Sequence, residues 1–115
     1  MTSSTIASFT LANLLYQKKF KAKGKTNAVY DQEGRLHWSD GNVQDGQIPA
    51  PNLLDAYLFI KNQYGLDIKI DQMGKDGYKA EIYRQGKLRK TQPICGATYE
   101  IALDSACVYI LEHFR

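Results

Sequence analysis

Residues 66–71 alternate strictly between apolar and charged side chains, and this run constrains the fold more than any other in the chain. Because successive side chains of a strand point to opposite faces, the alternation predicts a strand with one buried face. Residues 78–83 alternate in a similar way, and a tight turn after them predicts a third strand over residues 87–92. Three strands joined by short turns predict an antiparallel sheet with one face toward the core.

Segments with helical periodicity lie before and after these strands. Over residues 51–64 apolar side chains recur every three or four positions, and Gly65 suits the left-handed conformation that ends many helices. Residues 99–114 show the same period after Thr98, which is a favourable N-cap. The order of helix, antiparallel strands and helix predicts an α+β fold, a small layered sandwich whose mainly antiparallel sheet carries packed helices.

The first half of the chain is expected to add elements to the same domain. Residues 6–20 have helical periodicity, and residues 26–40 are predicted to form a hairpin with a glycine in its turn. We therefore predict a single domain over residues 1–115. Within it, residues 1–49 supply an N-terminal helix, hairpin and polar loop, and residues 50–115 supply the unit of helix, three strands and helix.

Two short motifs resemble those of a group of small, uncharacterised phage or prophage proteins from Bacteroides-type bacteria. The first is Ala-Pro-Asn-Leu at residues 50–53, and the second is Thr-Tyr-Glu-Ile-Ala at residues 98–102. That group has threonine where this chain has Asn52, and a second glutamate where it has Ile101. The resemblance implies the pattern of helix, three-stranded sheet and helix, together with a prophage origin, and it carries over no functional residue.

The composition argues against several function classes. The chain has two cysteines and two histidines, none at the spacing of a zinc site, so we expect no metal and no cofactor. No apolar run approaches the ~20 residues that span a membrane, and no basic and apolar leader opens the chain, so we expect a cytoplasmic protein without membrane contact. In the hairpin, Trp38 is expected to point inward and His37 outward, because neighbouring strand residues alternate. This leaves His37 without a catalytic arrangement, and we expect no enzymatic activity.

A short basic segment is the first candidate site. It holds five lysines in eight residues, with Phe20 among them: Lys18, Lys19, Lys21, Lys23 and Lys25. Cations that bind phosphates and aromatic rings that stack on bases are the two requirements of single-strand nucleic-acid binding. The alternative is a solvated helix end, where lysines favour the helix dipole and keep the protein soluble.

The sheet supplies the second candidate site. If the turn at residues 85–86 has two residues, Tyr83 lies beside Leu88 on the solvent side, and arginines flank them. Tyrosine and arginine are favoured in protein interfaces. The predicted protein contact is therefore Tyr83, Arg84, Leu88 and Arg89.

These observations rank three functions. The first is a non-enzymatic accessory protein, encoded by a prophage, that acts by binding another protein whose identity the sequence does not give. The alternative is a nucleic-acid-binding protein that uses residues 18–25. The third is a small-ligand binder in which the polar loop over residues 39–49 acts as a lid.

Overall fold

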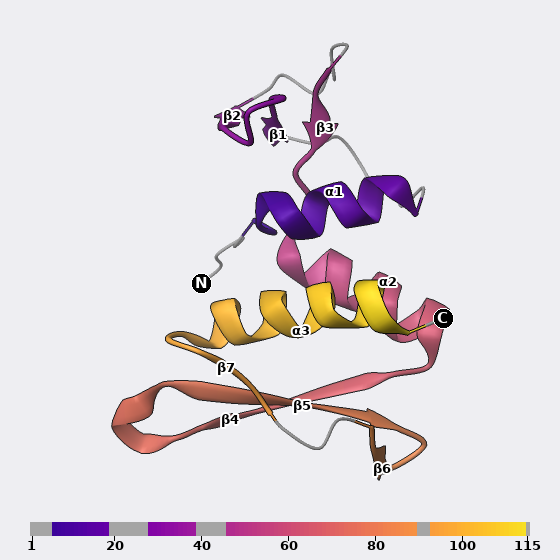
Figure 1. Cartoon of the computed structure of the whole chain (residues 1–115), viewed down its shortest axis with the longest axis vertical. Coiled ribbons are helices and arrows are strands. Elements are labelled where there is room, and N and C mark those ends of the chain that lie inside the picture. The colour runs from indigo at the N-terminus through magenta and orange to yellow at the C-terminus, as the bar shows by residue number, and fades with distance from the viewer. Residues whose placement is uncertain (1–5, 19–27, 39–45, 90–92, 115) are drawn as a thin grey trace. The chain divides into compact units, whose positions relative to one another are not determined.

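The computed structural model describes residues 6–18, 28–38, 46–89 and 93–114 (Figure 1). The described residues contain three α-helices and seven strands, which confirms the predicted α+β class. They belong to two compact units, Met1–Ala56 and Tyr57–Arg115, each with its own antiparallel sheet. The division falls within helix α2, Leu53–Tyr64.

The first unit begins with helix α1, Phe9–Gln17. The hydroxyl of Ser8 accepts a hydrogen bond from the backbone N–H of Leu11 at 3.2 Å, which caps the first turn. The sequence predicts a helix from residue 6, but Ile6 forms a β-bridge with Asn52, so α1 begins later. The predicted end at residue 20 lies outside the described residues.

Three short strands form the sheet of the first unit: β1, Ala28–Tyr30; β2, Leu36–Trp38; and β3, Ile48–Pro49. Strand β1 pairs antiparallel with both others, so the order is β2-β1-β3. The predicted hairpin is confirmed over its described part, residues 28–38. All of β1 is buried, whereas every residue of β2 is exposed.

Helix α1 packs on β1 and β3 through a small apolar core. Tyr30 is central to this core, because its ring meets the ring of Phe9 edge-on at a centroid distance of 5.4 Å. Its hydroxyl donates a hydrogen bond to the backbone oxygen of Ala7 at 2.6 Å, so the polar end of the side chain is also satisfied. The same apolar cluster contains Ala12, Ala28 and Ala50, with Ile6 and Ile48 packed against them.

The second unit is built on four strands: β4, Asp67–Gln72; β5, Tyr78–Arg84; β6, Lys87–Leu88; and β7, Ile94–Gly96. Strand β5 is central and pairs antiparallel with all three others. The predicted third strand over residues 87–92 is found only as β6, and residues 90–92 lie outside the described residues. Strand β7 is an addition to the prediction, because three residues after Pro93 are too few to show alternation.

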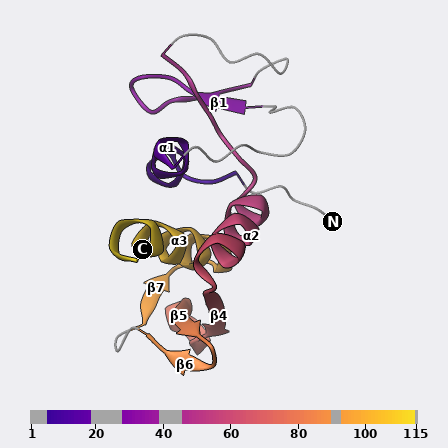
Figure 2. The ribbon, with the colours of Figure 1, turned by 90° about the vertical axis from the view of Figure 1, so that its right-hand side faces the viewer.

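Helix α3, Tyr99–His113, covers one face of this sheet (Figures 1 and 2). Its predicted cap is confirmed, since Thr98 Oγ1 accepts a hydrogen bond from the N–H of Ile101 at 3.1 Å. Three alanines make the contact between helix and sheet: Ala80, Ala102 and Ala106. Partly buried side chains on the same face of the sheet surround them: Ile68, Ile70, Tyr78 and Ile94.

The close approach of α3 to β7 depends on Gly96. A Cβ atom at this position would lie 2.5 Å from the backbone nitrogen of Ala102 and 2.9 Å from its Cα. Both neighbours are helix backbone, which cannot move aside without displacing α3. We therefore expect Gly96→Ala to lower the free energy of unfolding by about 1–3 kcal/mol, the usual cost of overpacking.

Urea unfolding followed by circular dichroism measures this loss. Ala97→Ser is the matched control, because Ala97 is the next residue and is exposed. An equal midpoint for Gly96→Ala and the control would contradict the close approach of α3 to β7.

Candidate functional site

The predicted turn between β5 and β6 has two residues, as expected. Gln85 and Gly86 both have positive φ, +53° and +78°, which suits the primed turns of tight hairpins. The register places Tyr83 opposite Leu88 on the face of the sheet away from α3, and Leu88 is 45% exposed. Tyr83 is half-buried, and its hydroxyl donates to Glu81 Oε1 at 3.5 Å.

The two arginines of the predicted protein contact do not join this pair. Arg84 alternates to the opposite face of β5, where its Nη2 donates to the backbone oxygen of Tyr64 at 3.1 Å. Its guanidinium carbon also lies 5.7 Å from the ring centroid of Phe114. Arg89 is exposed, and its N–H donates to the oxygen of Ile82 at 2.8 Å, so it lies across from Ile82. The structure therefore brings together only Tyr83 and Leu88 of the four predicted residues.

The predicted basic segment is described only at its first residue. Lys18 is exposed at the end of α1, and its backbone N–H donates to the oxygens of Leu14 and Leu15, both at 3.1 Å. The other four lysines, at positions 19, 21, 23 and 25, lie outside the described residues. Most of the predicted lid, residues 39–45, lies outside them as well.

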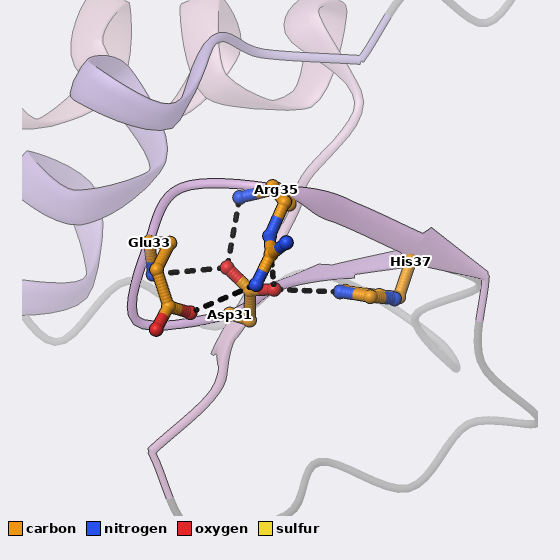
Figure 3. Close-up of polar contacts among 4 residues, drawn as sticks. All are labelled: Asp31, Glu33, Arg35 and His37. Atoms are coloured by element: carbon orange, nitrogen blue, oxygen red, sulfur yellow. Dashed lines mark hydrogen bonds and ion pairs between the residues drawn. The ribbon is translucent and has the colours of Figure 1, made fainter.

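The hairpin of the first unit holds a compact polar cluster in its turn (Figure 3). Asp31 Oδ1 accepts hydrogen bonds from the backbone N–H groups of Glu33 and Arg35, each at 2.9 Å. Asp31 Oδ2 lies 2.7 Å from His37 Nε2 and 3.3 Å from Arg35 Nε. Gly34, at φ +83°, closes the three-residue loop as a glycine bulge. One carboxylate thus holds the turn and joins it to strand β2.

The environment of Asp31 strongly favours its charged form. The bond from His37 is the largest cause, followed by the bond from the Arg35 N–H, and together they hold the pKa of Asp31 well below its usual range. Asp31 and His37 form a histidine–aspartate pair. The same carboxylate also accepts hydrogen bonds from two backbone N–H groups and from Arg35, so its contacts stabilise the hairpin turn.

Trp38 lies on the same face of the hairpin as the core residues Ala28 and Tyr30, but it is not buried there as the sequence predicts. Trp38 is 75% exposed, and Leu36 is 42% exposed. The register places these residues opposite Ala28 and Tyr30, so they share the face of the sheet that α1 covers. Among the described residues, the apolar cluster beneath α1 includes residues of β1 and β3 but none of β2, so the two apolar side chains extend beyond this core.

The alternation of side chains along the sequence predicts that Leu36 and Trp38 lie on the same face of β2. No local feature of the sequence indicates that this face is left uncovered. Exposure depends on which strands helix α1 packs against. We define the edge patch as Leu36 and Trp38 on β2. It is the candidate site that sequence analysis missed.

The described residues contain no group of three or more histidine, cysteine, aspartate or glutamate side chains that could hold a metal ion. Within the same residues, no helix is both long enough and apolar enough to cross a membrane.

Comparison with known proteins returned no relative. The chain matches no protein-family model, no curated protein and no solved structure with significance. The resemblance to prophage proteins therefore stays a prediction from the sequence.

The polar cluster predicts how the hairpin responds to acid. Because the pKa of Asp31 is lower in the folded state than in the unfolded chain, its carboxylate stabilises the hairpin at neutral pH. This contribution is complete above the unfolded pKa, about 3.9, and is lost as the pH falls through the folded pKa. We expect the carboxyl carbon of Asp31, followed by NMR, to titrate below that ordinary value.

Substitution of the main partner tests the cause. In His37→Ala the titration midpoint of Asp31 should move upward toward the ordinary value, because the largest favourable bond is gone. Gln32→Ala, an exposed change in the same turn, is the control and should leave the midpoint in place. An unchanged midpoint in His37→Ala would show that the bond in Figure 3 does not form in solution.

Proposed function

We propose that this chain is a non-enzymatic accessory protein that binds another protein, and that the edge patch is the principal contact. The observation that carries the proposal is Trp38, the only tryptophan of the chain, which is 75% exposed. Leu36 lies on the same face two residues away, so the two exposed side chains are neighbours.

The free energy that burial of Trp38 would supply favours the interpretation of the edge patch as a contact surface. Scattered exposed apolar residues are normal on protein surfaces. Tryptophan is the residue most enriched among those that dominate binding energies, because it buries a large rigid ring and retains one polar group. A large apolar side chain gains about 1.5–3 kcal/mol on full burial, and a partner that covers Trp38 would supply this gain.

Tyr83 and Leu88 remain a second proposed contact. They are directly opposed on the face of their sheet away from α3, and Leu88 is exposed. That face is otherwise charged, with Lys69 opposite Glu81 and Asp71 opposite Lys79. Opposite charges across a sheet are typical of a solvated surface, so this contact ranks behind the edge patch.

The proposed setting is the cytoplasm of a bacterium that carries the prophage. The chain has two free cysteines, Cys95, which is exposed, and Cys107. Cys107 is buried in α3, and burial raises the pKa of its thiol well above the ordinary value, which makes it unreactive.

Affinity capture from a lysate of that bacterium tests the proposal. Wild-type protein should retain a partner that Trp38→Ala loses, because the substitution removes the exposed ring. Tyr16→Ala is the matched control: Tyr16 is an aromatic residue of the same unit, 54% exposed on α1, and its loss should leave capture intact. Circular dichroism checks that both variants fold.

The purified partner then allows a direct measurement. Since Trp38 is the sole tryptophan, quenching of its fluorescence by acrylamide should be strong in the free protein and weaker in the complex. Equal capture by wild type and Trp38→Ala, or unchanged quenching in a complex, would refute the edge patch as the contact.

The nucleic-acid alternative rests on the local excess of lysine at residues 18–25 and is tested separately. Fluorescence anisotropy with labelled single- and double-stranded oligonucleotides should show binding that weakens steeply with salt, because phosphate contacts release counterions. Neutralising the five lysines should abolish it, whereas Lys75→Gln, an exposed lysine of the second unit, should not. Absence of binding at low salt would eliminate this function.

A further inference from the structure

Among the described residues, β2 is an edge strand of its sheet, and its backbone directs hydrogen-bonding groups away from β1. The N–H of Ala50 donates to the oxygen of Ala28 at 3.0 Å, so Ala28 directs its backbone groups toward β3. Antiparallel strands alternate between bonded and non-bonded pairs, so Trp38, which is opposite Ala28, directs its N–H and C=O away from β1.

The hydrogen bonds of the turn show that the backbone groups of Leu36 also point away from β1. The N–H of Asp31 donates to the oxygen of Arg35 at 3.0 Å, which makes these two residues a bonded pair. By alternation the next pair, Tyr30 with Leu36, is non-bonded, and Leu36 also directs its backbone groups outward. Two residues of β2 therefore offer both their backbone groups and their exposed apolar side chains at one edge.

Strands β3, β4 and β6 carry features that discourage pairing at their free edges. Strand β7 carries neither a charge nor proline, but helix α3 packs closely against it at Gly96. On β3, Pro49 is opposite Val29 in a non-bonded pair, so an outward N–H is missing where proline stands. Strand β6 carries Lys87, and β4 carries three exposed or half-buried charges: Asp67, Lys69 and Asp71. Charged side chains and proline are the usual protection of edge strands. Strand β2 has neither between its ends and presents leucine and tryptophan instead.

The exposed area decides between two kinds of occupant. A whole aromatic side chain offers about 150–250 Å², so the two partly exposed side chains of the edge patch together offer at most about 300 Å². A stable interface between folded proteins buries about 800 Å² on each partner. The patch is too small to hold a second copy of the chain by itself. A single added strand needs less area, because main-chain hydrogen bonds supply part of its affinity.

We propose that β2 is a strand-addition site that binds an extended segment of the partner protein. The segment pairs with the outward groups of Leu36 and Trp38. Its alternate side chains are apolar where they lie beside the edge patch, and polar on the opposite face, where His37 and the Asp31 cluster lie. This inference rests on the proposed function and specifies how the edge patch recognises its partner.

The probe is a peptide selected from a displayed random library against the wild-type protein, then synthesised with a fluorescent label. The selected peptides should alternate apolar and polar residues. Methylation of the peptide nitrogens that face β2 should weaken binding by about tenfold for each hydrogen bond lost. Methylation of the intervening nitrogens, which point away from β2, is the matched control and should have little effect. Equal effects of the two methylation patterns would overturn strand addition.

A matched pair of protein variants tests the hydrogen bond that the outward N–H of Leu36 donates to the peptide. Leu36→Pro and Leu36→Ala both remove the leucine side chain, but only proline removes the outward N–H. No hairpin bond is lost, because that N–H points away from β1. Leu36→Pro should bind the peptide about tenfold more weakly than Leu36→Ala. The methylated peptides decide the question on wild-type protein if the proline variant does not fold.

Failure of strand addition can be distinguished from failure of the proposed function. If Trp38→Ala abolishes partner capture but methylation has no effect, the edge patch binds protein through side chains alone and strand addition is wrong. If Trp38→Ala also leaves capture intact, both proposals fail. Sedimentation equilibrium provides the remaining outcome: a wild-type dimer that Leu36→Pro dissociates would show that β2 pairs with a second copy, which overturns the peptide as occupant.

Discussion

The first unit depends on the contact between Tyr30 and helix α1, which fixes the strands that the helix covers. Tyr30, on the central strand, contacts α1 through the ring of Phe9 and the backbone oxygen of Ala7, and this anchors the helix over β1 and β3. The apolar cluster beneath α1 includes residues of β1 and β3 and none of the described residues of β2. Strand β2 is left beyond the covered area, and the exposure of its apolar side chains follows from that placement.

A strand that buries no side chain needs another source of order, and the turn supplies it. Asp31 satisfies two backbone N–H groups and draws in His37, which is on β2 itself. Gly34 provides the positive φ that the loop requires. Strand β2 is thus held by a local polar network and by its pairing with β1, and its outer edge and apolar face are not needed to maintain the hairpin.

Local features of the sequence predict local structure well. The alternation over residues 66–71, the cap at Thr98 and the two-residue turn at residues 85–86 all depend on neighbouring residues, and the structure has each of them. The exposure of Trp38 and the engagement of Arg84 with Tyr64 and Phe114 depend on which elements meet in space. Periodicity fixes the face on which such a side chain lies, but not whether another element covers that face.

The same distinction explains why the edge patch differs from the contacts that the sequence suggested. The predicted contact consists of residues close together in the sequence: Tyr83, Arg84, Leu88 and Arg89. Because successive side chains of β5 and β6 point to opposite faces of the sheet, these four are divided between the two faces. Leu36 and Trp38 are kept together by that same alternation, and the outward backbone groups belong to the same two residues. In an antiparallel hairpin the non-bonded positions of an edge strand share one face, so outward backbone groups and side chains coincide there as a rule of geometry. What distinguishes β2 is that the residues at these positions are leucine and tryptophan, where the corresponding position of β3 has proline.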